Sequence, residues 1–255
     1  FQSSDSTSTS DYQGLLMPHI DYRRGATTYD RLLPHLNNVL EYDRVIILGI
    51  SHYPCEVPFS PTDKTFQTPF GNVQADQNAY DQFKDILPYN PNRGEWSHRT
   101  EHSIEIPLHL LKYLDPDSNF QIFPMLCSFT AVSIDPSLLN NVINALGNMT
   151  GDNTFLISAV DFAHLGPKHG DRETLTEQDH GAMEQQDRRM FEHIKQASPS
   201  KFDEHITLDD NARRVCGYPA IRTTLPLFDQ AEILDYDYWD DPRDTVSYGA
   251  ALLYS

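Results

Sequence analysis

The sequence predicts an α/β fold in which helices cover both faces of a central sheet. Short runs rich in Ile, Val, Leu, Phe and Tyr, typical of buried strands, alternate with segments whose apolar residues recur at helical spacing. Alternating strands and helices typically pack as a sheet with helices on each side. A chain of 255 residues suits one large α/β domain or two small ones.

The predicted elements follow one another in a regular order. Six short, apolar segments are expected to be strands: 15–18, 45–50, 120–127, 154–160, 233–239 and 247–254. Six helices are expected between or beside them, each with an apolar stripe: 27–40, 75–86, 103–114, 136–149, 177–196 and 219–228. Two long loops remain, 51–72 and 161–176, and loops of this length are often functional.

Composition and charge exclude several classes of protein. The net charge is −18, from 37 acidic and 19 basic side chains, which indicates a solvated acidic surface and disfavours a nucleic-acid partner. No apolar run approaches the roughly 18 residues of a membrane span. Three sparse cysteines do not form a disulfide framework, so we expect a reducing, cytoplasmic compartment. Residues 1–11, mostly Ser, Thr and Asp, are expected to be a flexible tail.

Residues that bind metals or move protons end four short segments far apart in the sequence. They are His19, His52, the pair Asp161 and His164, and Cys216. Two of these segments directly follow apolar runs predicted as strands, and the carboxyl ends of strands in an α/β sheet converge on one crevice. Two histidines and a cysteine that arrive there from three directions indicate a transition-metal site.

The same residues also have simpler interpretations. Asp161 could cap a short helical turn with His164 packed beside it, or it could orient the His164 imidazole and favour its protonated form. Cys216 could be a small buried apolar residue. Alternatively, the adjacent Arg213 and Arg214, together with the N-terminus of the next helix, could stabilise its thiolate.

Three further positions extend the predicted site. His102 opens the helix predicted over 103–114, where it could belong to an ordinary helix cap or point into the crevice as a donor to a substrate. Asp21 and Tyr22 follow His19 and could form part of the pocket wall. Gly49, in the strand before His52, permits another backbone to approach closely.

Taken together and in order, these segments resemble the Memo-like protein family. The resemblance covers nearly the whole chain and rests on these segments: Pro18-His19-Ile20-Asp21-Tyr22, Leu48-Gly49-Ile50-Ser51-His52, Thr68-Pro69-Phe70-Gly71, Glu101-His102-Ser103-Ile104-Glu105, the run from Ser158 to Gly166, Cys216-Gly217 and the run from Ser247 to Ala251. That family is similar in fold to class III extradiol dioxygenases, which hold Fe(II) with two histidines and a glutamate and open catechol rings with O₂. The resemblance implies a single-domain, three-layer sandwich with a central mixed sheet over residues 12–255.

The resemblance also implies a set of metal ligands. His19 and His52 match the two histidine ligands, and Cys216 stands where the dioxygenases place the carboxylate. Fe(II) is the expected metal, with copper and zinc as alternatives because a thiolate ligand also favours them.

Roles in catalysis are implied in the same way. His164 matches the acid/base histidine, Asp161 its close companion, and His102 a position that lines the cleft. The expected function is a non-haem iron oxygenase acting on a small molecule with O₂. Two other functions stay open: a Memo-like module that binds metal or peptide without turnover, and a zinc hydrolase that uses the same ligands.

Overall fold

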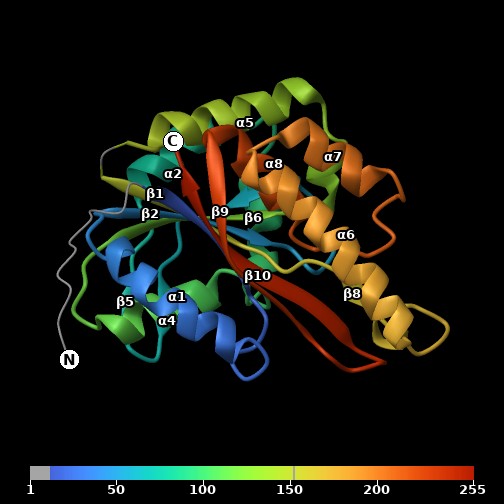
Figure 1. The fold of residues 1–255 in the computed structure, drawn as a ribbon. Coiled ribbons are helices and arrows are strands. Elements are labelled where there is room, and N and C mark those ends of the chain that lie inside the picture. The colour runs from blue at the N-terminus through green and yellow to red at the C-terminus, as the bar shows by residue number, and fades with distance from the viewer. Residues whose placement is uncertain (1–11, 152) are drawn as a thin grey trace, which may run out of the picture.

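The computed structural model describes residues 12–151 and 153–255, and the tail expected at 1–11 lies outside this part of the chain. Its fold is the predicted one: a single α/β domain with a mixed sheet between helices (Figure 1). The eight-stranded sheet has the order β3-β6-β2-β7-β1-β10-β8, and β9 pairs with β10. Its strands are β1 (Tyr12–Met17), β2 (Arg44–Ile50), β3 (Phe59–Pro61), β6 (Gln121–Cys127), β7 (Thr154–Ala159), β8 (His164–Leu165), β9 (Gln230–Trp239) and β10 (Thr245–Tyr254). A separate hairpin joins β4 (Phe66–Thr68) to β5 (Gly71–Val73).

The helices confirm the six predicted ones and add two. They are α1 (Ala26–Val39), α2 (Gln77–Lys84), α3 (Glu95–His98), α4 (Glu105–Leu114), α5 (Pro136–Met149), α6 (Glu177–Lys195), α7 (Pro199–Thr207) and α8 (Tyr218–Thr224). Short 3-10 turns lie at Pro91–Gly94, Phe129–Ser133, Pro167–His169 and Leu225–Leu227. No helix in the described part of the chain is both long and apolar enough to cross a membrane.

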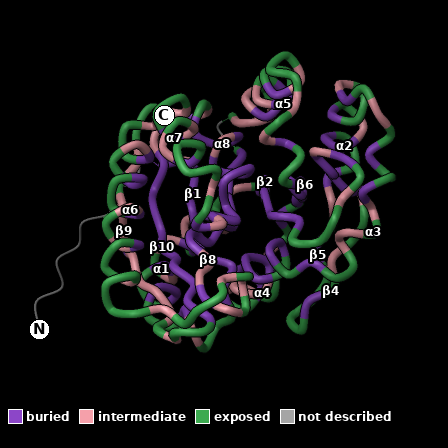
Figure 2. Tube along the Cα trace, turned by 90° about the vertical axis from the view of Figure 1, so that its right-hand side faces the viewer, coloured by how far each residue is buried: buried purple, intermediate pink, exposed green. Residues whose placement is uncertain are grey.

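Buried side chains of the strands alternate between two apolar cores, one on each face of the sheet. In β2, Ile46 and Leu48 face the core that is covered by α2, α5, α6, α7 and α8. Val45 and Ile47 face the core beneath α1 and α4. The buried strands stand out as the continuous interior of the trace in Figure 2. Burial of each such side chain stabilises the fold by about 1.5–3 kcal/mol. The sheet is therefore stable, and it holds the loops at its edges in place.

Strand direction brings three chain segments to one edge of the sheet. β2 pairs in parallel with both β6 and β7, and β7 pairs in parallel with β1. The carboxyl ends of β1, β2 and β7 therefore lie together, and the residues that follow them are neighbours in space.

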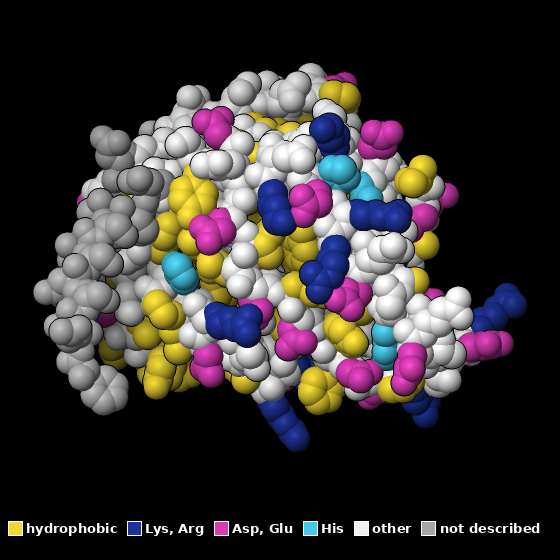
Figure 3. Space-filling view, in the orientation of Figure 1, with side chains coloured by type: hydrophobic (Ala, Val, Ile, Leu, Met, Phe, Trp, Pro, Cys, Tyr) yellow, Lys and Arg dark blue, Asp and Glu magenta, His cyan; other side chains and the backbone are white. Residues whose placement is uncertain are grey.

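The acidic composition does not produce one acidic patch on the face seen in Figure 3. Acidic and basic side chains are interspersed there, with apolar side chains between them. This distribution is typical of a solvated surface.

Candidate metal centre

A pocket of about 440 Å³ opens at the edge where β1, β2 and β7 end. His19, His52 and Asp161 each lie two residues beyond one of these strands. His102, which comes just before α4, and His164 line the same pocket. His19, His52, Asp161 and His164 therefore converge as predicted, and His102 joins them, in keeping with one of its two interpretations, whereas Cys216 is not among the residues that line this pocket.

Three imidazoles form the centre of this pocket. The nearest ring nitrogens of His19, His52 and His102 all lie within 4.8 Å of one another. Two nitrogens bound to one ion at about 2.1 Å are at most about 4.2 Å apart. A small movement of the three imidazoles toward one another would therefore suffice to hold a metal ion. The His52 and His102 rings are stacked with centroids 5.0 Å apart, and both meet the His19 ring edge to face.

Each imidazole is fixed through its Nδ1 atom. Nδ1 of His19 donates to the carbonyl oxygen of Ala159 at 2.9 Å. Nδ1 of His52 donates to the Glu101 carboxylate at 2.9 Å, and Nδ1 of His102 lies 3.3 Å from the same oxygen. A carbonyl or carboxylate at Nδ1 sets the tautomer and places the lone pair on Nε2, which is the usual arrangement of metal-binding histidines.

Glu101 is the residue that sequence reasoning missed. Its buried carboxylate also accepts the backbone N–H groups of His52 and His102, both at 2.9 Å, and of Ser103 at 3.3 Å. Burial alone would raise the pKa of Glu101, but hydrogen bonds from His102 and His52 outweigh burial and hold that pKa well below its usual range. The same carboxylate raises the pKa of His102. Glu101 thus places a negative charge behind two of the three imidazoles.

A close contact between the Ser103 side chain and the backbone of β2 brings Glu101 to this place. The Ser103 hydroxyl accepts the N–H of Ile50 at 2.9 Å and donates to the carbonyl oxygen of the same residue at 3.0 Å. A Cβ atom on Gly49 would lie 2.6 Å from that hydroxyl oxygen. Gly49 thus permits a close approach, but the approaching atoms belong to side chains and not to another backbone as predicted. The contact joins the segment before α4 to β2.

Asp161 supports the first histidine. Its Oδ1 accepts the backbone N–H groups of His19 at 3.0 Å and Ile20 at 3.3 Å, while Oδ2 lies 3.6 Å from Nε2 of His19. Burial raises the pKa of Asp161 to about 7 in spite of these hydrogen bonds. Burial also lowers the pKa of His19 well below its ordinary value, which favours the neutral imidazole that metals require.

The predicted partnership between Asp161 and His164 is wrong. The segment that joins them is extended and bonds to β10, through Phe162 N–H to the Ser247 carbonyl at 2.8 Å and Ser247 N–H to the Ala163 carbonyl at 2.9 Å. The two side chains therefore do not share the face of a helical turn. Nδ1 of His164 instead donates to the Phe162 carbonyl oxygen at 3.0 Å.

The protonation state expected for His164 is also corrected. Burial lowers the pKa of His164 to about 4, so the imidazole is neutral at neutral pH and does not carry the charge that an Asp161 partner would favour. With Nδ1 as the donor, Nε2 carries the lone pair. This makes His164 an unprotonated base on the wall of the pocket.

Cys216 lies behind His19. Its Sγ is 3.4 Å from Nε2 of His19 and 3.5 Å from the carbonyl oxygen of Asp161, and the side chain is buried. A Cβ atom on Gly217 would lie 2.8 Å from the same carbonyl, so a glycine here lets the Cys216 loop pack closely. Cys216 thus contacts one imidazole and lies outside the group of three.

The arginines next to Cys216 do not stabilise a thiolate, so the first of the two interpretations of Cys216, a small buried residue, fits its surroundings. Arg213 is paired with the buried Asp187 of α6, and Arg214 bonds to the His164 carbonyl at 3.0 Å and to Asp171 at 2.5 Å. Both arginines hold loops together rather than face the sulfur. Burial, followed by the charge of Asp161, raises the pKa of Cys216 well above its ordinary value.

The fold and the site together define a three-layer α/β protein with an imidazole cluster that could hold a metal ion. The chain belongs to the Memo-like protein family, whose sequence model matches residues 1–252. It is similar to a MEMO1 family protein of Aquifex aeolicus, with 29% identity over 254 residues, which is 95% of this chain and 64% of that protein. A MEMO1 family protein of Thermus thermophilus is 28% identical over 216 residues, 84% of this chain and 62% of that protein. This chain thus spans less than two thirds of the length of these relatives.

The comparison with solved structures supports the fold. The uncharacterized protein JW3007 from Escherichia coli K12 superposes with a TM-score of 0.53 at 10% identity, over 94% of this chain and 98% of that one. At this identity the likeness concerns the architecture alone.

Proposed function

We propose that this protein is a metal-dependent enzyme of the oxygenase type that uses non-haem iron. The observation that carries the proposal is the group of three imidazoles whose Nδ1 atoms are all directed at buried carbonyl or carboxylate oxygens. Such anchoring fits a site that presents Nε2 lone pairs to one ion.

Two sets of ligands are compatible with this geometry. His19 and His52 belong to both sets, and the third donor is either His102, by proximity, or Cys216, by resemblance to the family. Cys216 would have to lose its proton, and a bound cation is the group that does this to a buried thiol. Comparing metal affinity in His102→Ala and Cys216→Ala distinguishes the two sets.

The side chains around the ion would have separate roles in proton transfer and in positioning the ligands. Bound iron would supply the redox chemistry with O₂ and open positions for substrate. The neutral His164 would take a proton from the substrate through Nε2, while its Nδ1–H stays on the Phe162 carbonyl. Asp161 would hold the His19 backbone in place, and the Glu101 carboxylate would hold the rings of His52 and His102.

The test is O₂ uptake by the Fe(II)-loaded protein in the presence of small phenols. We expect uptake that His164→Ala reduces by a factor of about 100 or more, with a much smaller change in phenol affinity. His180→Ala, on α6, is the matched control and should leave uptake unchanged. Equal uptake by His164→Ala and the control would refute the role of His164, and no uptake with iron bound would refute the oxygenase.

Zinc hydrolysis is the second candidate, because three histidines are also a set that catalytic zinc accepts. In that case the zinc-loaded protein would be colourless and indifferent to O₂, and His164 would serve as the base for an attacking water. Tight metal binding with no turnover of either kind would indicate a binding module.

A further inference from the structure

We propose that an apolar recess beside the metal pocket binds the aromatic or other apolar tail of the ligand whose polar head lies at the imidazole cluster. The recess, called here the aromatic annex, is lined by Tyr22, Pro69, Phe70, His109, Leu110 and Tyr113 and has a volume of about 330 Å³. The inference rests on the proposed function, because the head of the ligand is placed at the metal. It assigns the substrate class: a small molecule with a metal-binding group at one end and an uncharged apolar group at the other.

The annex adjoins the metal pocket. Tyr22 lines both cavities. On α4, Ile106 lines the metal pocket, whereas His109, Leu110 and Tyr113 line the annex. These four positions share one face of the helix. At 1.5 Å per residue, the path along α4 from Ile106 to Tyr113 is about 10 Å, a length that a small substrate can span.

The wall between the two cavities is rigid. The Tyr22 hydroxyl donates to the Ile106 carbonyl oxygen at 3.3 Å, and its ring packs 5.6 Å from the ring of the buried Tyr29. A ligand that extends from the metal pocket to the annex would therefore pass the fixed side chain of Tyr22, which lines both cavities.

The hairpin between β4 and β5 holds Phe70 against α4. Thr68 Oγ1 accepts the N–H of Phe70 at 3.1 Å and donates to the Gly71 carbonyl oxygen at 2.7 Å. Gly71 has φ = 132°, a conformation that other residues rarely adopt, so the turn requires glycine. The Phe70 ring lies 5.5 Å from the Tyr113 ring in an edge contact. This motif, recognised in the sequence as Thr68-Pro69-Phe70-Gly71, thus completes the annex.

Exposure and charge both favour an apolar occupant. The three aromatic side chains of the annex are exposed to 42% in Tyr22, 40% in Phe70 and 60% in Tyr113. They form an uncharged surface on a chain whose net charge is −18. Single exposed apolar residues are ordinary, but a contiguous aromatic patch beside a pocket is typical of a binding site. None of the six lining residues is Lys, Arg, Asp or Glu, so the site offers no partner to a charged tail.

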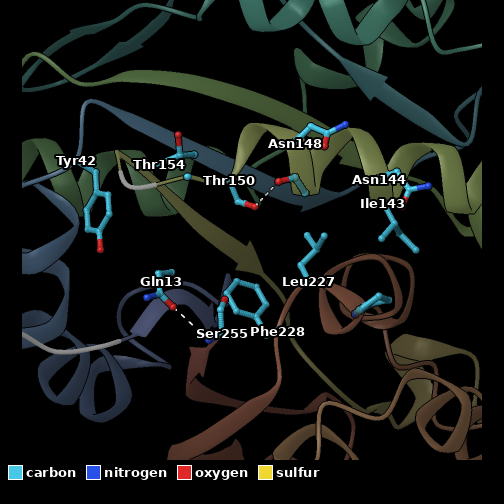
Figure 4. A pocket seen from close by; sticks show the side chains of 13 residues that line it. Gln13, Tyr42, Ile143, Asn144, Asn148, Thr150, Thr154, Leu227, Phe228 and Ser255 are labelled. Atoms are coloured by element: carbon cyan, nitrogen blue, oxygen red, sulfur yellow. Dashed lines mark hydrogen bonds between the residues drawn. The ribbon is translucent and has the colours of Figure 1, made fainter.

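A larger cavity at the opposite edge of the sheet does not serve this purpose. That cavity, of about 960 Å³, includes Tyr42, Asn148, Leu227 and Phe228 (Figure 4). It lies at the amino ends of β1 and β7 and shares no lining residue with the metal pocket. A single small ligand therefore reaches the annex and not this cavity.

The experiment uses zinc-loaded protein and two hydroxamic acids with the same metal-binding head. Acetohydroxamic acid has no tail, whereas 6-phenylhexanohydroxamic acid carries a phenyl group long enough to reach the annex. By calorimetry we expect the phenyl tail to raise affinity about 30-fold, the gain typical of burying one ring. Phe70→Ala and, separately, Tyr113→Ala should reduce this gain to about threefold or less, with acetohydroxamic acid and zinc bound as in wild type. Phe129→Ala, which truncates a ring of similar exposure outside the annex, is the control and should keep the full gain.

The outcomes separate the annex from the metal site. Equal affinities of the two hydroxamic acids for the wild-type protein would overturn the annex and leave the metal proposal standing. A phenyl gain that survives in both annex variants would also overturn it. Failure of acetohydroxamic acid to bind in a zinc-dependent way would overturn the metal centre that the proposed function requires, and with it the ligand assigned to the annex.

Discussion

Replacing Glu101 by glutamine tests whether the imidazole cluster is built to bind a metal. The carboxylate accepts hydrogen bonds from two imidazole Nδ1 atoms and three backbone N–H groups. A glutamine amide keeps one acceptor oxygen and turns an NH₂ group toward donors that then lack an acceptor. The rings of His52 and His102 would therefore lose part of their support and the negative charge behind them.

The expected loss follows from the number of imidazoles affected. A partner behind one metal-bound histidine is typically worth 10–100-fold in metal affinity. Because Glu101 supports two of the three rings, we expect about a 100-fold loss, which is about 2.8 kcal/mol. Buried donors left without acceptors should also lower the free energy of unfolding of the metal-free protein by about 1–3 kcal/mol.

Competition against a chromophoric chelator, under anaerobic conditions, measures the affinity, and urea unfolding measures the stability. Glu105→Gln is the matched control, since the Glu105 side chain is exposed and only four residues away. If Glu101→Gln bound metal as tightly as Glu105→Gln, the account of the imidazole cluster would be refuted.

Further predictions concern packing, ligands and pH. Gly49→Ala should lower the free energy of unfolding by about 1–3 kcal/mol, because its Cβ would lie 2.6 Å from a hydroxyl oxygen. Gly181→Ala in α6, whose Cβ would meet nothing within 4 Å, should instead raise it by about 0.5–1 kcal/mol; urea unfolding checks both. Cys216→Ala should weaken metal binding without unfolding the protein, and metal affinity no different from wild type would leave His102 as the third ligand. Burial lowers the pKa of His98 to about 4. Between pH 6.5 and 4, His98 is therefore protonated in the unfolded chain but not in the folded protein. Stability should therefore fall as the pH drops through this window, by up to about 3 kcal/mol from this group; His98→Gln should flatten the decline, and an unchanged pH profile would contradict the assignment.

Most of the fold could be predicted because the central strands are buried on both faces. β2 is apolar after Arg44, and β7 is apolar apart from Thr154 and Ser158, a composition typical of strands that are buried on both faces. β3 and β8 have only three and two residues, and they are strands because neighbouring strands offer them hydrogen bonds, which a short sequence does not encode. Helix α7 was missed because most of its side chains are polar.

The site residues that could be predicted are likewise those whose position depends on a strand, and the others depend on contacts between distant segments. His19 and His52 could be predicted because each follows a strand, and the ends of parallel strands must converge. The role of Glu101 depends on the contact of the following segment with β2, which joins residues about fifty positions apart. Arg213 likewise pairs with Asp187 of α6 and contacts His205 of α7, so its proximity to Cys216 in the sequence does not reveal its contacts.

Anaerobic titration with Fe(II), Cu(I) and Zn(II) tests whether the imidazole cluster binds a metal ion. We expect the wild-type protein to bind one ion per chain. Metal affinity should fall by at least about 100-fold in His19→Ala and in His52→Ala, while both variants keep their fold. A protein that binds none of these ions, or variants that bind them as tightly as wild type, would contradict the assignment of a metal centre to this edge of the sheet.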